Sequence, residues 1–130
     1  MFRALVDTGA GHCSINGLKI EIEDEADSPD QNLGKNARIL IANEHGEQAW
    51  IESRLVDYSH IRNVDTSKPR YHIRLTLSTS GVERLVTVTL KDRSHMTYPM
   101  LLGRNFLQDK FTVDVGKDSP DFPISGPGYQ

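Results

Sequence analysis

Apolar and polar residues alternate along several short stretches of the chain, with the period of two that is typical of β-strands. In Tyr71–Ser78 every odd-numbered residue is apolar and every residue between is polar, which predicts a strand with one buried face. Five further runs rich in Val, Ile, Leu and Thr have the length of a strand: Phe2–Asp7, Ala37–Ala42, Ala49–Val56, Arg84–Leu90 and Phe111–Val115. The pattern predicts antiparallel β-structure.

Two glycine-containing segments, Asn43–Gln48 and Ser78–Glu83, separate neighbouring strand-like runs. A single glycine between two strands is typical of a hairpin turn, so we expect two hairpins. Only Gly103–Lys110 has a helical pattern, and it is long enough for about two turns of helix. The sequence therefore predicts an all-β protein with one short C-terminal helix.

The remaining segments carry few apolar residues. Glu21–Asn36 holds six acidic residues and almost nothing apolar after Ile22, which predicts a solvated, mobile loop. Residues 117–130 are rich in Pro and Gly and are expected to form a flexible tail. We expect one domain over residues 1–116, because a chain of this length supports one hydrophobic core.

Composition excludes several classes of partner. The net charge is -3 and the 15 Lys and Arg residues are scattered along the sequence, so we do not expect nucleic acid as a partner. No apolar run approaches the ~18 residues of a membrane span, and the first residues lack the pattern of a signal peptide. A single cysteine, Cys13, closes no intramolecular disulfide. We expect a cytoplasmic protein.

The first candidate for chemistry is Asp7, which ends an apolar run and is followed by Thr8, Gly9 and Ala10. Small residues after an aspartate allow a tight turn and the close approach of a substrate, and the Thr8 hydroxyl can bond to neighbouring backbone. Taken alone, the motif is more typical of a strand-ending turn in which the carboxylate caps backbone N–H groups. Asp7 is therefore either a turn residue or a catalytic carboxylate.

A second motif, "YPMLLGRNFL" at Tyr98–Leu107, favours the catalytic interpretation. The pairing of "LVDTGA" with a later "MLLGRNFL" resembles the retropepsin-like aspartic peptidases. In that family a strand carrying Asp-Thr-Gly-Ala is crossed by a strand that ends in two hydrophobic residues and a glycine, just before a short helix. The resemblance implies a closed β-barrel with a flap hairpin, and Asn43–Gln48 lies between the motifs, where the flap belongs.

The same resemblance implies roles for individual residues. Asp7 would be the catalytic carboxylate, and Thr8, Gly9 and Ala10 would support the active-site loop. Gly103 and Arg104 would be structural, with Arg104 tying the short helix to the active-site loop.

A closer resemblance is to the bacterial and archaeal retropepsin-like family labelled ATP-dependent zinc proteases, which is associated in bacteria with ribosomal-protein glutamate ligases. The segments that carry it are Val6–Ala10, Arg70–Leu77, Val88–Leu107 and Phe111–Val115. The family usually has a basic and then a small hydroxyl residue after Asp-Thr-Gly-Ala, whereas this chain has Gly11, His12 and Cys13. The chain also opens almost directly on the catalytic strand, so we expect the family's N-terminal strand to be missing.

One carboxylate is insufficient for peptide hydrolysis by an aspartic peptidase. The reaction needs one ionised and one protonated carboxyl about 3 Å apart. Asp65, in "NVDTS", has polar neighbours and Pro69 after it, which is poor material for a buried strand, so we interpret it as a loop residue. We therefore expect a homodimer with a twofold axis through a pair of Asp7 residues, binding an extended peptide or protein substrate.

Metal and cofactor sites are not expected. The five histidines form no H-E-x-x-H motif, the chain has no C-x-x-C motif, and tetrahedral zinc needs three or four ligands. No phosphate-binding loop for ATP is present. His12 and Cys13 are adjacent and would point to opposite faces of a strand, so Cys13 is expected to be a buried thiol rather than a nucleophile. Trp50 and Phe106 are interpreted as packing residues, with a second interpretation for Trp50, in the flap hairpin, as a cover for bound peptide.

Three functions stay open from the sequence. The first is an aspartic endopeptidase with a dyad formed across a homodimer. The second is a noncatalytic peptide-binding or assembly module associated with an ATP-grasp peptide ligase. The third is the metal-dependent protease that the family label suggests.

Overall fold

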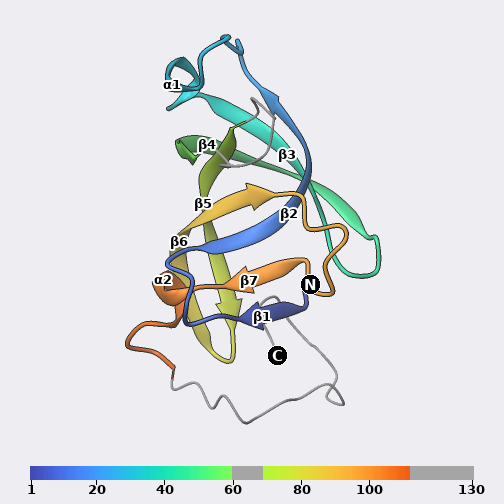
Figure 1. The fold of residues 1–130 in the computed structure, drawn as a ribbon, viewed down its shortest axis with the longest axis vertical. Helices are drawn as coiled ribbons and strands as arrows, with labels where there is room; N and C mark the ends of the chain where they lie inside the picture. The colour runs from blue at the N-terminus through green and yellow to red at the C-terminus, as the bar shows by residue number, and fades with distance from the viewer. Residues whose placement is uncertain (60–68, 112–130) are drawn as a thin grey trace.

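The computed structural model describes residues 1–59 and 69–111, which form a mostly β structure (Figure 1). Its elements are β1 (Ala4–Val6), β2 (Cys13–Ile22), α1 (Pro29–Asn32), β3 (Asn36–Ala42), β4 (Gln48–Ser59), β5 (Arg70–Thr79), β6 (Val82–Lys91), β7 (Met100–Leu102) and α2 (Arg104–Leu107). The all-β class is confirmed. Asp65, the predicted tail and all but the first residue of the predicted strand Phe111–Val115 lie outside the described residues.

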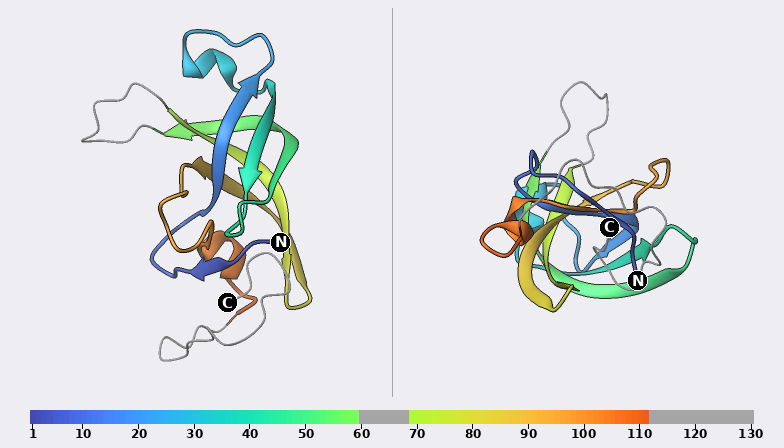
Figure 2. Two further views of the ribbon diagram at one scale, coloured as in Figure 1. Left: turned by 90° about the vertical axis from the view of Figure 1, so that its right-hand side faces the viewer. Right: turned by 90° about the horizontal axis from the view of Figure 1, so that it is seen from below.

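The strands form one sheet in the order β1-β7-β2-β3-β4-β5-β6, and β6 pairs in addition with β2. Because β6 pairs with both β5 and β2, the last strand of the series β2 to β6 lies beside the first. The strands are not arranged evenly around one axis, so the regular closed barrel is not confirmed (Figure 2). β1 and β7 lie beside the start of β2, and α1 lies at the far end of β2 and β3 (Figure 1).

The prediction of antiparallel structure is correct for most pairs and wrong for two. β1 pairs with β7 in parallel, with Val6 opposite Leu102, and β2 pairs with β6 in parallel, with Cys13 opposite Val88. Parallel partners are joined by long crossover connections, and alternation within a strand does not report which strand lies beside it. The sheet is therefore mixed.

The central strand β2 was not among the predicted strands. Polar residues such as Asn16 and Lys19 interrupt its apolar pattern. Its first half is buried where β6 and β7 pair with it, whereas most of its second half, which pairs with β3, is exposed. Tertiary pairing, rather than local alternation, makes this segment a strand.

Both predicted hairpins are confirmed. β3 and β4 are joined through a turn that contains Gly46 at φ 77°, and β5 and β6 are joined through Ser80 and Gly81. The φ angles of Ser80 and Gly81 are 53° and 79°, both in the left-handed region that the favoured two-residue hairpin turn requires. Glycine adopts this region without the steric cost that other residues bear.

The core gathers the inward-facing residues of the sheet and one residue of α2. Six strand residues and Phe106 have no exposed surface; the strand residues are Ala4, Cys13, Ile39, Leu55, Ile73 and Val88. In β5 the buried residues Ile73 and Leu77 lie on the face that alternation predicted. Trp50 is an exception to the predicted packing, because 41% of it is exposed and the Arg38 guanidinium lies 4.7 Å from the centre of its ring.

The acidic segment is more ordered than its composition predicted. β2 extends to Ile22, and the one-turn helix α1 ends at Asn32, which is only 1% exposed. The Asn32 side chain accepts a hydrogen bond from the N–H of Ala26 and donates to the Tyr71 hydroxyl on β5. One buried amide therefore anchors this loop to the sheet, a role that a count of charges does not reveal.

The predicted C-terminal helix is present but shorter than predicted. α2 has four residues, and the backbone N–H of Gln108 bonds to the carbonyl of Arg104 at its end. Asp109 then adopts a φ of 65°, which turns the chain out of the helical conformation. The helix supplies buried Phe106 to the core and places Arg104 beside the end of β1.

Candidate active site

Asp7 lies directly after β1, in a loop held by the backbone of β7. Its N–H donates to the carbonyl of Leu102 at 3.0 Å, and its own carbonyl accepts the N–H of Ala10 at 3.2 Å. One carboxylate oxygen, Oδ1, accepts the N–H of Gly9 at 2.9 Å. These hydrogen bonds hold the Asp7 backbone in place. The residue is half-buried, so part of it is still in contact with solvent. Asp7 thus caps its own turn, and among the described residues its second carboxylate oxygen has no hydrogen-bond partner.

Gly103 allows the active-site loop to cross the end of β7. A Cβ atom at this position would lie 2.5 Å from the carbonyl oxygen of His12 and 2.9 Å from that of Ala10. Real Cβ atoms do not approach backbone atoms so closely, so any side chain here would push the loop away. Close approach, and not an unusual φ, explains the glycine.

Arg104 joins α2 to the active-site loop through two hydrogen bonds. Its guanidinium donates from Nη1 to the carbonyl of Thr8 at 2.9 Å, and its backbone N–H donates to the carbonyl of Ala10 at 2.8 Å. The next residue, Asn105, donates its N–H to the carbonyl of Gly11 at 3.1 Å. Consecutive residues of the loop are therefore fixed to the start of α2.

Asn105 is a structural residue of the site that the sequence analysis missed. Its side-chain oxygen accepts both the N–H and the thiol of Cys13, each at 3.1 Å. Its side-chain nitrogen donates to the carbonyl of Thr87 on β6 at 2.8 Å. One side chain thus links α2, β2 and β6. Its place directly after Gly-Arg in the second motif was the only available sequence signal.

Cys13 is a buried thiol, as predicted. It has no exposed surface, and its sulfur also accepts the N–H of Gly103 at 3.4 Å. Burial raises the pKa of the thiol, and the backbone N–H groups of Gly103 and Phe106 offset this only in part. The sulfur therefore stays protonated and packs behind the active-site loop, whereas neighbouring His12 is exposed.

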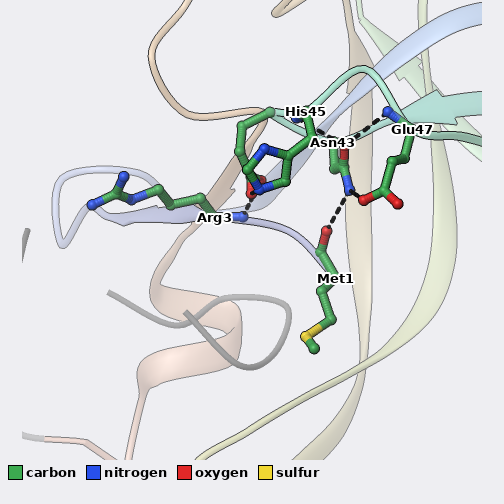
Figure 3. A network of polar contacts seen from close by, with 6 residues as sticks. Met1, Arg3, Asn43, His45 and Glu47 are labelled. Carbon is green, nitrogen blue, oxygen red and sulfur yellow. Dashed lines mark hydrogen bonds and ion pairs between the residues drawn. The ribbon is translucent and has the colours of Figure 1, made fainter. Parts of the chain in front are cut away.

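The turn between β3 and β4 is bound to the N-terminal segment (Figure 3). The amide nitrogen of Asn43 donates to the carbonyl of Met1 at 3.1 Å. The amide oxygen of Asn43 accepts the N–H groups of His45 and Glu47, which holds the turn closed. Asn43 is 9% exposed, so these bonds are sheltered from water.

This position shows that the flap assignment of Asn43–Gln48 is wrong. Glu44, in the same turn, accepts the N–H of Arg3 at 2.7 Å, at the beginning of β1. Asp7 follows the other end of β1, about 13 Å further along an extended chain. A flap covers the catalytic residue, whereas this turn packs against the opposite end of the catalytic strand.

Histidine, cysteine and acidic side chains do not assemble a metal site in residues 1–59 and 69–111: no three of them lie close enough to hold one ion. The rings of His12 and His72 approach within 5.9 Å between centroids, without a third ligand among the described residues. His45 lies 3.4 Å from its neighbour Glu44. His60 falls outside the described residues.

Comparison with known proteins adds the family. The sequence model described as "Retropepsin-like aspartic endopeptidase RimB" matches residues 1–120. The chain belongs to the RimB-like family. The predicted resemblance to retropepsin-like aspartic peptidases is thereby confirmed. A search of the curated proteins finds no match.

A solved structure shares the fold of this RimB-like chain. It is protein Lpg0085 of unknown function from Legionella pneumophila subsp. pneumophila str. Philadelphia 1, with a TM-score of 0.60 and 23% sequence identity. The match covers 81% of this chain and 72% of the Legionella protein. At this identity the likeness supports the fold alone.

Two further expectations concern a membrane span and the roles of the site residues. Among the described residues, no helix is long and apolar enough to cross a membrane. The catalytic role of Asp7 and the supporting roles of Thr8, Gly9 and Ala10 stay predictions.

Proposed function

We propose that this RimB-like chain is an aspartic endopeptidase in which Asp7 pairs with Asp7 of a second copy across a twofold axis. The observation that carries the proposal is the setting of the Asp7 carboxylate. The backbone is clamped to β7, Oδ1 accepts the N–H of Gly9, and the second oxygen has no hydrogen-bond partner in the described chain. A carboxylate held in this way can accept a proton from water without moving its backbone.

The proposed chemistry uses two carboxyls with one shared proton. Like charges about 3 Å apart cannot both ionise, so one carboxyl stays protonated. The ionised carboxylate takes a proton from water as the water oxygen bonds to the scissile carbonyl carbon, and the protonated carboxyl gives its proton to the carbonyl oxygen. The first carboxyl then gives the proton it took from water to the leaving nitrogen as the C–N bond breaks. The second carboxylate takes a proton back from a hydroxyl of the tetrahedral intermediate, which restores the pair. A single copy of Asp7 supplies half of this arrangement.

The dimer follows from the number of carboxylates in the active-site loop. Asp7 is the one acidic residue between β1 and β2. An isologous contact brings two copies of the same residue to one axis, which makes it the simplest source of a dyad. Thr8, the exposed neighbour of Asp7, would brace the dyad across that axis.

The substrate we propose is a peptide or protein bound in an extended conformation, paired by its backbone as an added strand. The complete barrel, a cytoplasmic location and a functional link to a ribosomal-protein glutamate ligase belong to the same proposal and rest on the family resemblance. No cofactor is required, since water is the nucleophile and protons move between the two carboxyls.

The test compares the parent with Asp7→Asn on a peptide library at acidic to neutral pH. The variant is expected to lose all hydrolysis and keep its unfolding midpoint, because asparagine has the same shape but cannot share the proton. Asp109→Asn, at an exposed position after α2, is the matched control and should cleave as the parent does.

Equal cleavage by Asp7→Asn and the parent would show that Asp7 is not the catalyst. A parent that binds library peptides but cleaves none would support the noncatalytic binding module. Cleavage that a chelator abolishes and stoichiometric zinc restores would support the metal-dependent protease.

A further inference from the structure

A buried arginine follows β6 and has no acidic partner within residues 1–59 and 69–111. Arg93 is 4% exposed, and its guanidinium donates from Nε to the carbonyl of Tyr98 at 3.0 Å and from Nη1 to the Ser14 hydroxyl at 3.1 Å. Its backbone N–H donates to the side-chain oxygen of Asn16. All three acceptors are neutral, and no carboxylate of residues 1–59 and 69–111 bonds to this guanidinium. A buried charge is costly unless a counter-charge lies beside it.

The arginine lies at the edge of a polar surface of the sheet. Residues directly opposite each other on neighbouring strands project to the same face. A first row of opposed residues runs across β2, β6, β5 and β4. A second row lies two residues along each strand and consists of two opposed pairs, one between β2 and β6 and one between β4 and β5. We call them the polar sheet face; it consists of Ser14, Thr89, His72 and Asp57 in the first row and Asn16, Lys91, Arg70 and Ser59 in the second.

Two further cations belong to the second row of this face. Lys91 lies opposite Asn16, and Arg70 lies opposite Ser59, so both project on the side that Arg93 contacts. Burial lowers the pKa of Lys91, and the positive charges of Arg70 and Arg93 lower it further. Within the described chain, neither Lys91 nor Arg70 forms an ion pair. Three like charges therefore lie within range of mutual repulsion.

The nearby carboxylates do not neutralise these cations. Asp57, in the first row, accepts the N–H of Tyr58, and its charge acts on His72. Asp92 precedes Arg93 but accepts both the N–H and the hydroxyl of Ser94. In the part of the chain that the structure describes, neither acid pairs with a cation of the polar sheet face.

We propose that Arg70, Lys91 and Arg93 form a binding site for a small multivalent oxoanion of the phosphate class. Arginine has five N–H donors in its guanidinium, and the two side-chain bonds of Arg93 leave three for a ligand. Guanidinium and ammonium groups are the strongest protein donors to phosphate oxygens. The side-chain nitrogen of Asn16, on the same face, offers a neutral donor, whereas the Ser59 hydroxyl lies 3.2 Å from Nε2 of His72 and is already engaged.

Phosphate fits this face better than a side chain of a peptide does. The two rows contain no apolar residue, so they offer no pocket for the hydrocarbon part of a peptide side chain. Three cations match an ion of two or more negative charges, whereas one carboxylate leaves most of the positive charge unpaired. The site lies on other residues than the Asp7 loop and does not depend on the proposed hydrolysis.

The experiment measures phosphate binding to the full chain by calorimetry and by thermal unfolding, against chloride at equal ionic strength. The parent is expected to bind one phosphate and to show a saturable rise in Tm. Lys91→Met and Arg70→Met should each weaken binding at least about tenfold, because each removes a charge-assisted bond. Lys110→Met, at an exposed position off the polar sheet face, is the matched control and should bind as the parent does.

Lys91 and Arg70 are chosen for substitution because they are half-buried, so their loss should leave the fold intact. Arg93 is buried, and Arg93→Met would remove its hydrogen bonds and destabilise the fold. A rise in Tm that does not saturate, or that is equal in Lys91→Met and Lys110→Met, is a general salt effect and overturns the proposal. Glutamate serves as a carboxylate probe at the same ionic strength. Tighter binding of glutamate than of phosphate overturns the phosphate assignment.

Discussion

Gly103 and Arg104 position Asp7 through backbone contacts rather than through side-chain packing. Gly103 lets the backbone at His12 and Ala10 cross β7, and Arg104 bonds to the carbonyl groups of Thr8 and Ala10. The two residues of this motif have different roles. Gly103 has no side chain, so the active-site loop can approach β7 closely, and the long Arg104 side chain bonds to that loop. The position of the Asp7 carboxylate depends on both residues.

Gly103→Ala tests this dependence. The added Cβ meets backbone atoms, so we expect the free energy of unfolding to fall by about 1–3 kcal/mol, together with a loss of any hydrolysis. Urea unfolding followed by circular dichroism measures the change. Gly11→Ala is the control, because its Cβ would lie 3.4 Å from the movable end of the Arg104 side chain and should cost little. Equal stability of Gly103→Ala and the parent would refute the close-approach explanation.

The strands differ in how far their own residues predict them. β5 alternates along its length and places Tyr71, Ile73 and Leu77 in the core as alternation predicts, but His72 on its other face is buried as well. β2 has residues buried on both faces at its beginning and exposed at its end, so its pattern is set by three different neighbours. The β3–β4 turn was recognised as a hairpin, yet its contact with Met1 was not predictable from its own residues.

His72 on β5 makes the stability of the sheet depend on pH. Burial lowers its pKa from the ordinary value near 6.5; the charge of Asp57 opposes this shift, and neighbouring His12 adds to it. The unfolded chain therefore binds a proton near pH 6.5 that the folded chain binds only at lower pH. Stability is full above that range and is lost as the pH falls through the pKa of the folded state.

We expect the unfolding free energy of the parent to fall more steeply on acidification below the ordinary histidine pKa than that of His72→Gln. Urea titrations at a series of pH values measure the difference. His95→Gln, at an exposed position, is the control and should follow the parent. Parallel curves for the parent and His72→Gln would rule out a buried neutral His72.

At the scale of the whole molecule, the proposed enzyme is a pair of chains. One chain offers one clamped carboxylate, and the proposed chemistry requires two. Activity and dimerisation should therefore rise together with protein concentration, since mass action controls the number of complete sites. Sedimentation equilibrium and cleavage rates over one dilution series measure both.

Mixing the parent with Asp7→Asn tests whether each copy supplies half of the dyad. After exchange of subunits in an equal mixture, about a quarter of the dimers hold two parent chains if pairing is random. We expect the activity of the mixture to fall to that fraction of the all-parent value at the same total protein concentration. Activity at half of the all-parent value would mean that each chain works independently.

Local alternation and short motifs were enough to predict the all-β class, both hairpins, the buried thiol and the association of Asp-Thr-Gly-Ala with Gly-Arg-Asn. These features depend on neighbouring residues or on a motif with a known partner. Pairing between distant strands determined the rest: the central place of β2, the position of the Asn43 turn at the wrong end of β1 for a flap, and the meeting of Arg70, Lys91 and Arg93. A period of two specifies which face of a strand is buried, but it carries no information about which strand lies beside it.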